Sequence, residues 1–426
     1  MPSLVTGTPD QAAAAHHDPG PGWKVRFWFI FVGQALSLIG SALTQFVLLW
    51  WITDTTGSVS ALATAGMAAL LPQAVLGPFG GVLADRYNRR ILMIAADSIS
   101  ALCMLVLIAL FLTGSIELWH AYVMMAVRSS MQAFQAPAAA ASTAMLVPRQ
   151  FLPRAAGLNQ TLLGLMTVAA APLGALAISV MPIGLALGID VLTALLGIVP
   201  LLLFRIPQPG VPPGDRSSLW GEFQGGVRLV WDHPGLRRLY GLLGAVVLVV
   251  MPSFTLVPLL VKEHFGGGAG HVAVMEGVAG AAMLAGGLLV AAFPPGRPMP
   301  WILSGLAGSC FALALAALMP AQLFWAAVLW WGVSGVAFVI GDAPMMALLQ
   351  SSIPHHQQGR ALSLMTAIMG LAAPVGLAVA SPIGELVGTR WLFVLLGMLA
   401  GCITLAGFWS RPLRRFGQGT KQLADQ

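Results

Sequence analysis

Twelve stretches of mainly apolar residues follow one another along this chain of 426 residues. A helix needs about 20 such residues to cross the hydrocarbon core of a bilayer. The stretches are Phe27–Trp51, Val59–Leu83, Ile91–Thr113, Leu118–Ala141, Gly157–Val180, Ile183–Phe204, Leu239–Val261, Val272–Phe293, Trp301–Met319, Gln322–Leu349, Ala361–Pro382 and Trp391–Ser410. Charged residues make up 8% of the chain, against about 25% in soluble domains. The sequence therefore predicts an all-α membrane protein with twelve transmembrane helices.

The polar residues argue against several other classes of protein. The net charge is +6, but Lys and Arg are dispersed over many loops, so we expect no nucleic-acid partner. The three cysteines lie in separate apolar stretches and predict neither a disulfide framework nor a metal site. The sequence holds no Walker motif for nucleotide binding, and we expect no cofactor.

The positions of Lys and Arg predict which loops face the cytoplasm, because loops on that side are enriched in these residues. Every second connection carries them, from Lys24 at the start of the first stretch to Arg411 after the last. The connections between carry almost none, with Lys262 and Arg390 as the exceptions. We therefore expect both termini to lie in the cytoplasm.

The longest connection, residues 205–238, divides the chain into two similar halves. Several residues recur at an offset of 206, among them Gly80 with Gly286 and Arg154 with Arg360. Residues 217–231 place large apolar side chains at helical spacing, which predicts an amphipathic helix on the lipid headgroups or packed against the bundle. The expected parts are a disordered cytoplasmic tail (1–26), a first six-helix half (27–204), a cytoplasmic linker (205–238), a second six-helix half (239–410) and a cytoplasmic tail (411–426).

A charged loop between the second and third stretches carries the most specific motif. Residues 80–90 read Gly-Gly-Val-Leu-Ala-Asp-Arg-Tyr-Asn-Arg-Arg. This pattern closely resembles the signature loop of the major facilitator superfamily, with Asn88 in place of the usual second glycine. The resemblance implies two six-helix halves related as parallel repeats. We expect Asp85 to pair across the seam between the halves when the transporter faces outward. The expected gating residues are Gly81, Asp85, Arg86, Arg89 and Arg90.

Other stretches narrow the resemblance within that family. Residues 55–58, Arg128-Ser129 with Pro137, and residues 146–148 and 358–360 together resemble the branch of macrolide efflux pumps and the enterobactin exporter. This resemblance implies a secondary active exporter of amphipathic small molecules such as drugs or macrolides, working as a proton antiporter in the bacterial inner membrane. The implied partners are the substrate, protons and the lipid bilayer, and we expect a monomer. Residues 169–175 keep the proline of the drug-antiporter motif within a run of alanines, which weakens the antiporter assignment.

Charged residues inside the apolar stretches are costly to insert into a membrane and mark candidate functional positions. They are Asp97, Arg128, Asp190, Glu276 and Asp342. The family resemblance links Arg128 to proton handling, and the alternative is a structural ion pair with Asp97. Asp97 could instead hold the arginines of the signature loop or carry a proton. We interpret Asp190 as a helix-terminus residue.

Two acids of the second half are the expected proton carriers. A carboxyl group in a poorly hydrated span binds a proton more readily than one in water. Glu276 and Asp342 fit this role, because neither has a basic residue nearby in its own stretch. Asp97 is less suitable if Arg128 pairs with it, but both residues belong to the candidate set for proton coupling.

Polar and aromatic residues of the first, fourth, seventh and tenth stretches predict the substrate cavity. The expected lining residues are Gln34, Ser37, Ser41, Gln45, Gln132, Gln135, Phe254 and Trp331. Such a surface suits bulky amphipathic molecules better than simple ions or sugars. Ser and Gln also join helices by hydrogen bonds, and aromatic residues also form belts at the membrane interface, so packing is the alternative for each residue.

Two other functions stay open at this point. A dedicated exporter of a siderophore or another metabolite would have the same fold. A membrane-bound sensor or enzyme would need an intramembrane His, Ser or metal cluster, or a soluble output domain, and the sequence offers neither. We therefore expect a transporter and not an enzyme, without catalytic residues.

Overall fold

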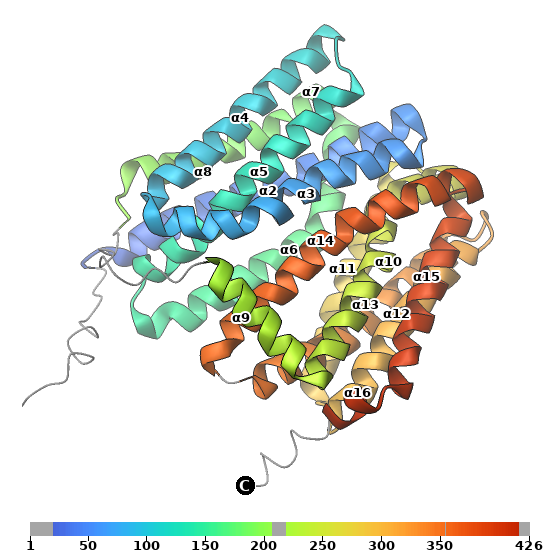
Figure 1. The fold of residues 1–426 in the computed structure, drawn as a ribbon. Coiled ribbons are helices and arrows are strands. Elements are labelled where there is room, and N and C mark those ends of the chain that lie inside the picture. Colours follow the sequence, from blue (N-terminus) through green and yellow to red (C-terminus); the bar gives the residue numbers. More distant parts are fainter. Residues whose placement is uncertain (1–19, 207–218, 354, 417–426) are drawn as a thin grey trace, which may run out of the picture.

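The computed structural model describes residues 20–206, 219–353 and 355–416. Within these residues, twelve helices of 16 residues or more form the bundle (Figure 1). They are α2 (Trp23–Thr56), α3 (Val59–Arg86), α4 (Arg89–Thr113), α5 (Leu118–Leu146), α6 (Leu152–Val180), α8 (Gly188–Leu203), α10 (Pro234–Phe265), α11 (Ala269–Ala292), α12 (Pro298–Leu318), α13 (Phe324–Ser352), α14 (His355–Val387) and α15 (Thr389–Ala406). The predicted all-α membrane fold is confirmed.

Eleven of the described helical segments are long and apolar enough to cross a membrane. One of these segments joins the short helix α7 (Ile183–Ala186) to α8. The remaining long helix, α5, has 29 residues and carries Arg128, Gln132 and Gln135 together with four serine and threonine residues, which lower its hydropathy. α5 is therefore the helix whose sequence departs furthest from a lipid-facing span.

Most helices are longer than the apolar stretches that predicted them. α2 begins at Trp23, inside the residues expected to form the first tail, and α16 (Arg411–Phe416) lies inside the expected second tail. The reason is physical: hydropathy detects the part of a helix that suits the hydrocarbon core, whereas its hydrogen-bonded backbone continues into the polar region beyond.

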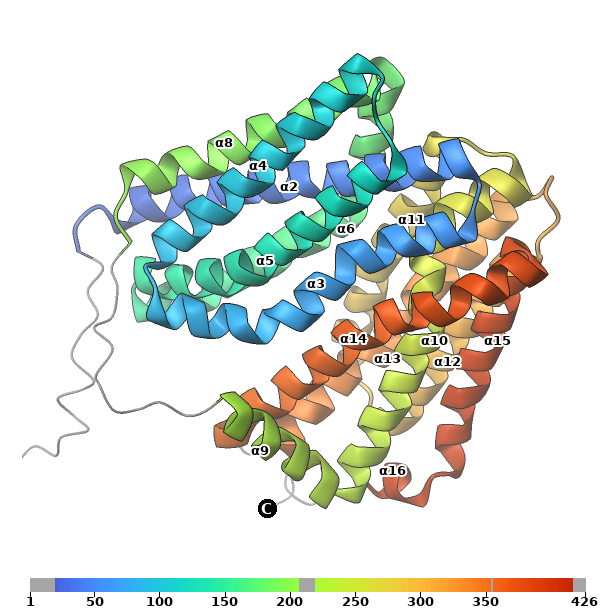
Figure 2. The same cartoon turned by 45° about the horizontal axis from the view of Figure 1, so that its top comes forward.

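Two groups of helices, α2–α8 and α10–α15, form the two halves. We call the end that holds the α2–α3, α10–α11 and α14–α15 turns the closed end, and the end that holds the α3–α4 turn the basic end. In Figure 2, α3 and α14 approach each other at the closed end and separate toward α9 (Leu219–Asp232) at the basic end.

The buried apolar residues follow the same division. At the closed end, residues of both halves form one hydrophobic cluster, in which Val47 and Leu62 join Leu256 and Phe393. At the basic end, the described residues form two separate clusters, one within each half. Apolar burial therefore joins the halves at the closed end and stabilises each half by itself at the basic end.

Small residues let helices of the two halves approach along the seam. A Cβ added at Gly66 of α3 would lie 2.7 Å from Leu377 of α14, and one at Gly280 of α11 would lie 2.8 Å from Val168 of α6. Close approach at small residues is the usual means of helix association in a membrane.

The offset of 206 residues also appears in the packing. A Cβ at Gly80 would meet the backbone of Ala133 in α5. One at Gly286 would lie 2.9 Å from the carbonyl oxygen of Val336 and 3.2 Å from the side chain of Val339, both in α13. Ala133 and Val339 are themselves 206 positions apart. The α3–α5 contact of the first half and the α11–α13 contact of the second half are thus equivalent.

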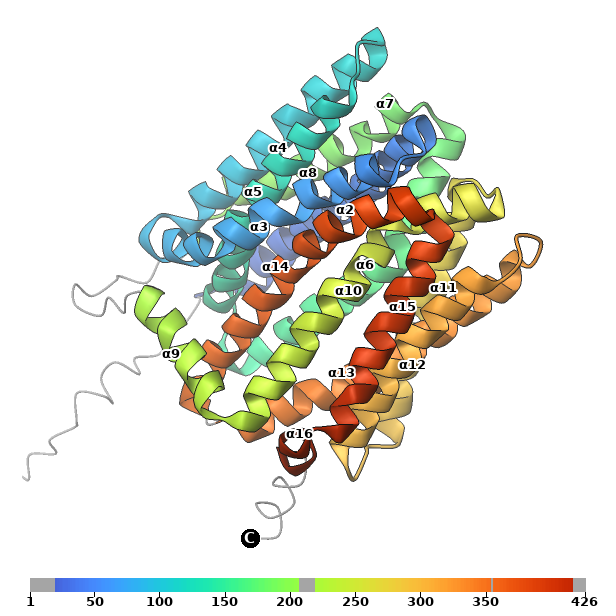
Figure 3. The same cartoon turned by 45° about the vertical axis from the view of Figure 1, so that its right-hand side comes forward.

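The predicted amphipathic helix of the central connection is present as α9. It lies across the basic end of the second half, against α10 and the start of α14 (Figure 3). Val230 is buried in the cluster of the second half, whereas Trp231 is exposed. α9 therefore packs against the bundle with one face and leaves a large aromatic residue on the other. The proline-rich residues 207–218 lie outside the described chain.

Candidate functional site

A cavity of about 560 Å³ lies between α2, α4, α5 and α6 of the first half. It extends from Phe27 and Leu146 at the basic end to the middle of these helices. Apolar side chains form most of its wall, and the amides of Gln132, Gln135 and Asn159 interrupt it. A mainly apolar cavity with a few placed polar groups is the usual form of a small-molecule site.

Three of the eight predicted cavity residues, Gln34, Gln132 and Gln135, line this cavity. Sequence reasoning missed Asn159 of α6. An amide inside a long apolar helix indicates a polar surface, and this is the feature by which the glutamines were selected.

The other predicted cavity residues lie elsewhere. Ser37 packs against Gly197 of α8, and Ser41 donates a hydrogen bond to Asp190. Gln45 is half-buried. Phe254 is 43% exposed and contacts Trp331 edge to face, with ring centroids 5.9 Å apart. Trp331 is buried in the hydrophobic cluster of the closed end.

The wall of the cavity contains a chain of hydrogen-bonded side chains from three helices. Gln135 Nε2 donates to Gln34 Oε1 at 2.6 Å, and Gln34 Nε2 donates to Asp97 Oδ2 at 3.2 Å. Asp97 and Gln34 are both buried. Gly33 brings α2 against α8, since a Cβ there would lie 2.5 Å from a backbone oxygen of α8. The sequence thus places Gln34 at a tightly packed helix contact.

Arg128 forms a buried ion pair with Asp190 and not with Asp97, so the pairing considered from the sequence is wrong. The distance from Arg128 Nη1 to Asp190 Oδ2 is 3.1 Å, and Nη2 donates to the carbonyl oxygen of Ser41 at 3.0 Å. The interpretation of Asp190 as a simple helix-terminus residue is therefore incomplete, because its carboxylate joins α8 to α5 and α2. Each charge compensates the other, which a buried pair requires.

The two acids of the second half are placed differently. Glu276 in α11 and Asp342 in α13 are half-buried. In the described part of the chain, neither carboxylate has a hydrogen-bond or ion-pair partner. The structure does not bring Glu276 or Asp342 into the polar network of the first half.

The signature loop links α3 and α4 at the basic end. Gly81 has open space around it, and Arg86 is exposed. Arg89 donates to the carbonyl oxygens of Ala84 and Ala141. Arg90 donates to two carbonyl oxygens at the end of α8. The described arginine contacts hold the loop to its own half, and the side chain of Asp85 lies outside the described residues.

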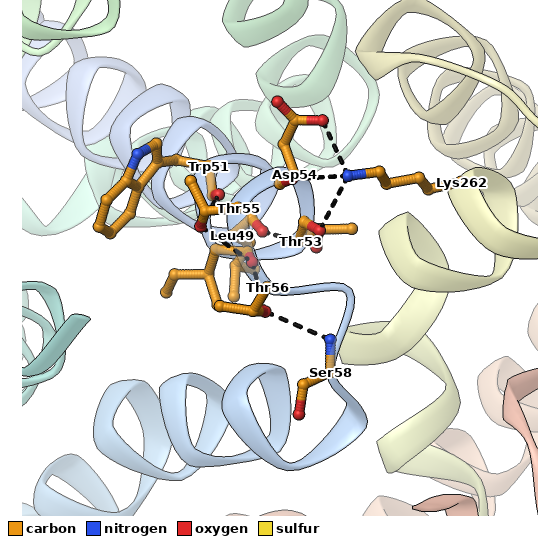
Figure 4. A network of polar contacts seen from close by, with 9 residues as sticks. Leu49, Trp51, Thr53, Asp54, Thr55, Thr56, Ser58 and Lys262 are labelled. Carbon is orange, nitrogen blue, oxygen red and sulfur yellow. Dashed lines mark hydrogen bonds and ion pairs between the residues drawn. The ribbon is translucent and has the colours of Figure 1, made fainter. Parts of the chain in front are cut away.

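The closed end carries an ion pair between the halves that sequence reasoning missed. Lys262 Nζ of α10 lies 2.9 Å from Asp54 Oδ1 of α2 and donates to the carbonyl oxygens of Asp54 and Thr53, at 2.7 and 3.3 Å (Figure 4). These carbonyls belong to the last turn of α2, where the helix dipole favours a cation. Gly57, at φ +56°, then supplies the left-handed conformation that ends the helix.

A carboxylate of the second half binds the other side of the same turn. Glu385 Oε1 of α14 accepts hydrogen bonds from Ser58 Oγ at 3.0 Å and from the backbone N–H of Ser60 at 2.9 Å. Ser58 also caps α3, and a helix N-terminus favours an anion. We call Lys262 and Glu385, bound to the two sides of the α2–α3 turn, the two-charge clamp.

Two six-helix halves, joined at one end and holding a cavity within the membrane region, form the architecture of a secondary transporter. Comparison with known proteins agrees with this class. Residues 30–357 match the model of the Major Facilitator Superfamily. The chain therefore belongs to this superfamily and is a multi-pass membrane transporter of small molecules.

Several relatives and solved structures are similar to the chain over most of its length. Macrolide efflux protein A of Streptococcus pyogenes is 33% identical over 389 residues, which cover 90% of this chain and 95% of the relative. Macrolide efflux protein A of Enterococcus faecalis is 32% identical over 75% of this chain and all of the relative. The crystal structure of a POT family transporter in complex with 5-aminolevulinic acid has a TM-score of 0.71 at 13% identity, covering 94% of this chain and 96% of the other.

Proposed function

We propose that this protein exports macrolides or similar amphipathic small molecules, driven by proton entry. The observation that carries the proposal is the likeness to macrolide efflux proteins over 90% of the chain. The cavity of the first half supports it, because apolar walls with a few amides suit a large amphipathic molecule. We further propose that the protein is a monomer in the inner membrane of a bacterium.

The basic end faces the cytoplasm in this proposal, as do both termini. The Lys and Arg residues of alternate loops support this orientation. The shared hydrophobic cluster at the closed end and the separate clusters at the basic end support a state that is open to the cytoplasm. Export then requires the closed end to open and the basic end to close, with the signature-loop residues Gly81, Asp85, Arg86, Arg89 and Arg90 as the proposed gate.

Erythromycin susceptibility tests the export of macrolides. The chain is expressed in a susceptible bacterium that lacks its own macrolide pumps, and the amount of inserted protein is measured in the membrane fraction. The expected result is growth at higher erythromycin concentrations and lower accumulation of the labelled drug. Unchanged accumulation with well-inserted protein would overturn the proposal.

Proton coupling is proposed for Glu276, Asp342, Asp97 and Arg128. In proteoliposomes, Glu276→Gln or Asp342→Asn should abolish accumulation of substrate driven by a pH gradient while exchange of substrate for substrate continues, because exchange needs no net proton movement. Asp232→Asn is the control, since this acid is exposed on α9, outside the bundle. If both single variants still concentrate substrate, coupling depends on the polar network of the first half.

A dedicated siderophore exporter is the second candidate from the sequence. A basic cavity would favour an anionic siderophore, and Arg128 is the cation that would supply this charge. The guanidinium of Arg128 is neutralised by Asp190 at 3.1 Å, so this observation no longer favours an anionic substrate.

A further inference from the structure

Asp97 is a buried acid of the first half whose described partner is an amide and not a cation. It is 9% exposed and accepts its hydrogen bond from Gln34. Arg128 donates hydrogen bonds to the carboxylate of Asp190 and to a backbone carbonyl oxygen of α2. Among the described residues, Gln34 lines the cavity and Asp97 lies behind it. Gln34 is therefore the hydrogen-bonded link between Asp97 and a molecule in the cavity.

Two acceptors determine how the Gln34 amide is oriented. Its Nε2 faces the ionised carboxylate of Asp97 and, at 3.3 Å, the carbonyl oxygen of Gly197, and neither of these groups can donate a hydrogen. The amide oxygen of Gln34 therefore faces Gln135, which must donate through Nε2. The amide oxygen of Gln135 is then the acceptor left for a ligand. Both hydrogen bonds of this series, from Gln135 to Gln34 and from Gln34 to Asp97, are donated in the direction of Asp97.

We propose that the chain Gln135–Gln34–Asp97 couples the binding of substrate in the cavity to the protonation of Asp97, with Gln34 as the positioning residue. The substrate class is an amphipathic molecule that presents an ammonium or hydroxyl donor to the amide oxygen of Gln135. This inference rests on the proposed function, because it assigns a proton-sensing group to the cavity of the exporter.

The physical basis is polarisation along the hydrogen bonds. A negative charge on Asp97 makes Gln34, and through it Gln135, a stronger acceptor for a donor in the cavity. Protonation of Asp97 removes this charge and replaces a charge-assisted hydrogen bond with one about half as strong. Because coupling is reciprocal, a bound donor favours the ionised carboxylate, and the proton of Asp97 leaves to water. Substrate and proton then oppose each other's binding without contact, as exchange requires.

The charged groups around Asp97 leave it free to exchange a proton. Arg89 and Arg90, at the start of its own helix, donate to backbone carbonyls. Arg128 of α5 pairs with Asp190 of α8 at 3.1 Å and not with Asp97. The carboxylate of Asp190 is also the charged group that acts on Asp97 electrostatically.

The test measures erythromycin binding to the purified full-length protein, because this macrolide carries both hydroxyl groups and an amine. For the wild type, Kd should rise roughly tenfold from about pH 8 to about pH 6, within the usual range for coupled sites. A pH indicator in weak buffer should report proton release on binding. In Gln34→Leu and Asp97→Asn, Kd should change less than about twofold over this range, with no proton release.

Gln132→Leu is the matched control. Gln132 lines the same cavity from the same helix as Gln135 but lies outside the hydrogen-bonded chain. This variant should bind erythromycin more weakly and keep both the pH dependence and the proton release. Gln135→Leu replaces Gln34→Leu if the latter does not fold.

The outcomes separate the two proposals. Wild-type binding that is independent of pH, or equal proton release by the wild type and Gln34→Leu, overturns this inference alone. Wild-type protein that neither binds nor exports erythromycin overturns the proposed function and the inference with it.

Discussion

Replacing Lys262 with Met should loosen the closed end without removing its apolar packing. The Nζ atom binds the Asp54 carboxylate at 2.9 Å and two carbonyl oxygens at the end of α2. Met keeps an unbranched apolar stem of similar length but carries neither charge nor donor. The substitution therefore removes the cation of the two-charge clamp and little else.

The magnitude follows from exposure and geometry. The side chains of Lys262 and Asp54 are 33% and 59% exposed, and such ion pairs contribute about 0.2–1 kcal/mol. A cation at a helix C-terminus contributes about 0.3–1 kcal/mol. After allowance for screening by salt, we expect a loss of about 1 kcal/mol. That corresponds to about a fivefold change in the ratio of closed to open molecules.

The assay is maleimide labelling of a cysteine placed at Val59, in a protein whose native cysteines have been replaced. Val59 is buried against Gly384 of the second half, so labelling requires the closed end to open. Lys262→Met should raise the labelling rate about fivefold at low salt and less at high salt.

Arg390→Met is the matched control for this assay. Arg390 is also a cation near the closed end, but it donates to carbonyl oxygens of Ala317 and Leu318 in its own half. Its replacement should leave the labelling rate at Val59 unchanged. Equal rates for the wild type and Lys262→Met, or the same acceleration by Arg390→Met, would refute the reasoning.

The buried ion pair, the glycine pair and the signature loop allow three further tests. Arg128→Met should lower the free energy of unfolding by about 3–5 kcal/mol, because Asp190 is left unpaired. Adding Asp190→Leu to the same protein should recover much of this lost stability. Thermal melting that shows no recovery in the double variant would contradict the role of the ion pair. Gly80→Ala should reduce stability by about 1–3 kcal/mol, because a Cβ would clash with a backbone carbonyl of α5. Gly81→Ala should leave stability unchanged, since the surroundings of Gly81 are open. Equal melting temperatures of the Gly80→Ala and Gly81→Ala variants would argue against the close contact of Gly80 with α5. Asp85→Asn should reduce export at an unchanged amount of membrane protein, and full export would exclude a gating role.

The helices were predictable from the sequence because each must present about 20 apolar residues to the bilayer. Three glutamines of the cavity were also predictable, since an amide inside a span needs a polar surface. The helix ends were not, because hydropathy does not detect the part of a helix outside the hydrocarbon core. Ser37 and Ser41 do not line this cavity, and their positions on α2 do not show which neighbour that side of the helix faces.

The partner of Arg128 could have been predicted from depth. At 1.5 Å per residue, Arg128 lies about 15 Å along α5 from the closed end, and Asp190 lies about 10 Å along α7 and α8. Asp97 lies about 24 Å from that end of α4. Arg128 and Asp190 are thus closer in depth, although rotation about each helix axis still had to bring the side chains together.

The two-charge clamp was missed for a different reason. Lys262 stood out only as an exception to the distribution of positive charge, and Glu385 was not selected at all. A charged residue at an otherwise weakly charged helix end was the available signal. That signal does not identify the partners, because only the three-dimensional arrangement shows that α10 and α14 of one half meet the α2–α3 turn of the other.

The polar contacts fall into two sets that should respond differently when the halves move. The Gln135–Gln34–Asp97 chain and the Arg128–Asp190 pair lie within the first half, so rotation of one half against the other as a rigid body leaves them intact. The two-charge clamp joins the halves, so the same rotation must break it. Changes in the clamp should therefore shift the ratio of the two states. Changes in the chain should alter how substrate and proton affect each other within a state, because its contacts are the same before and after the rotation.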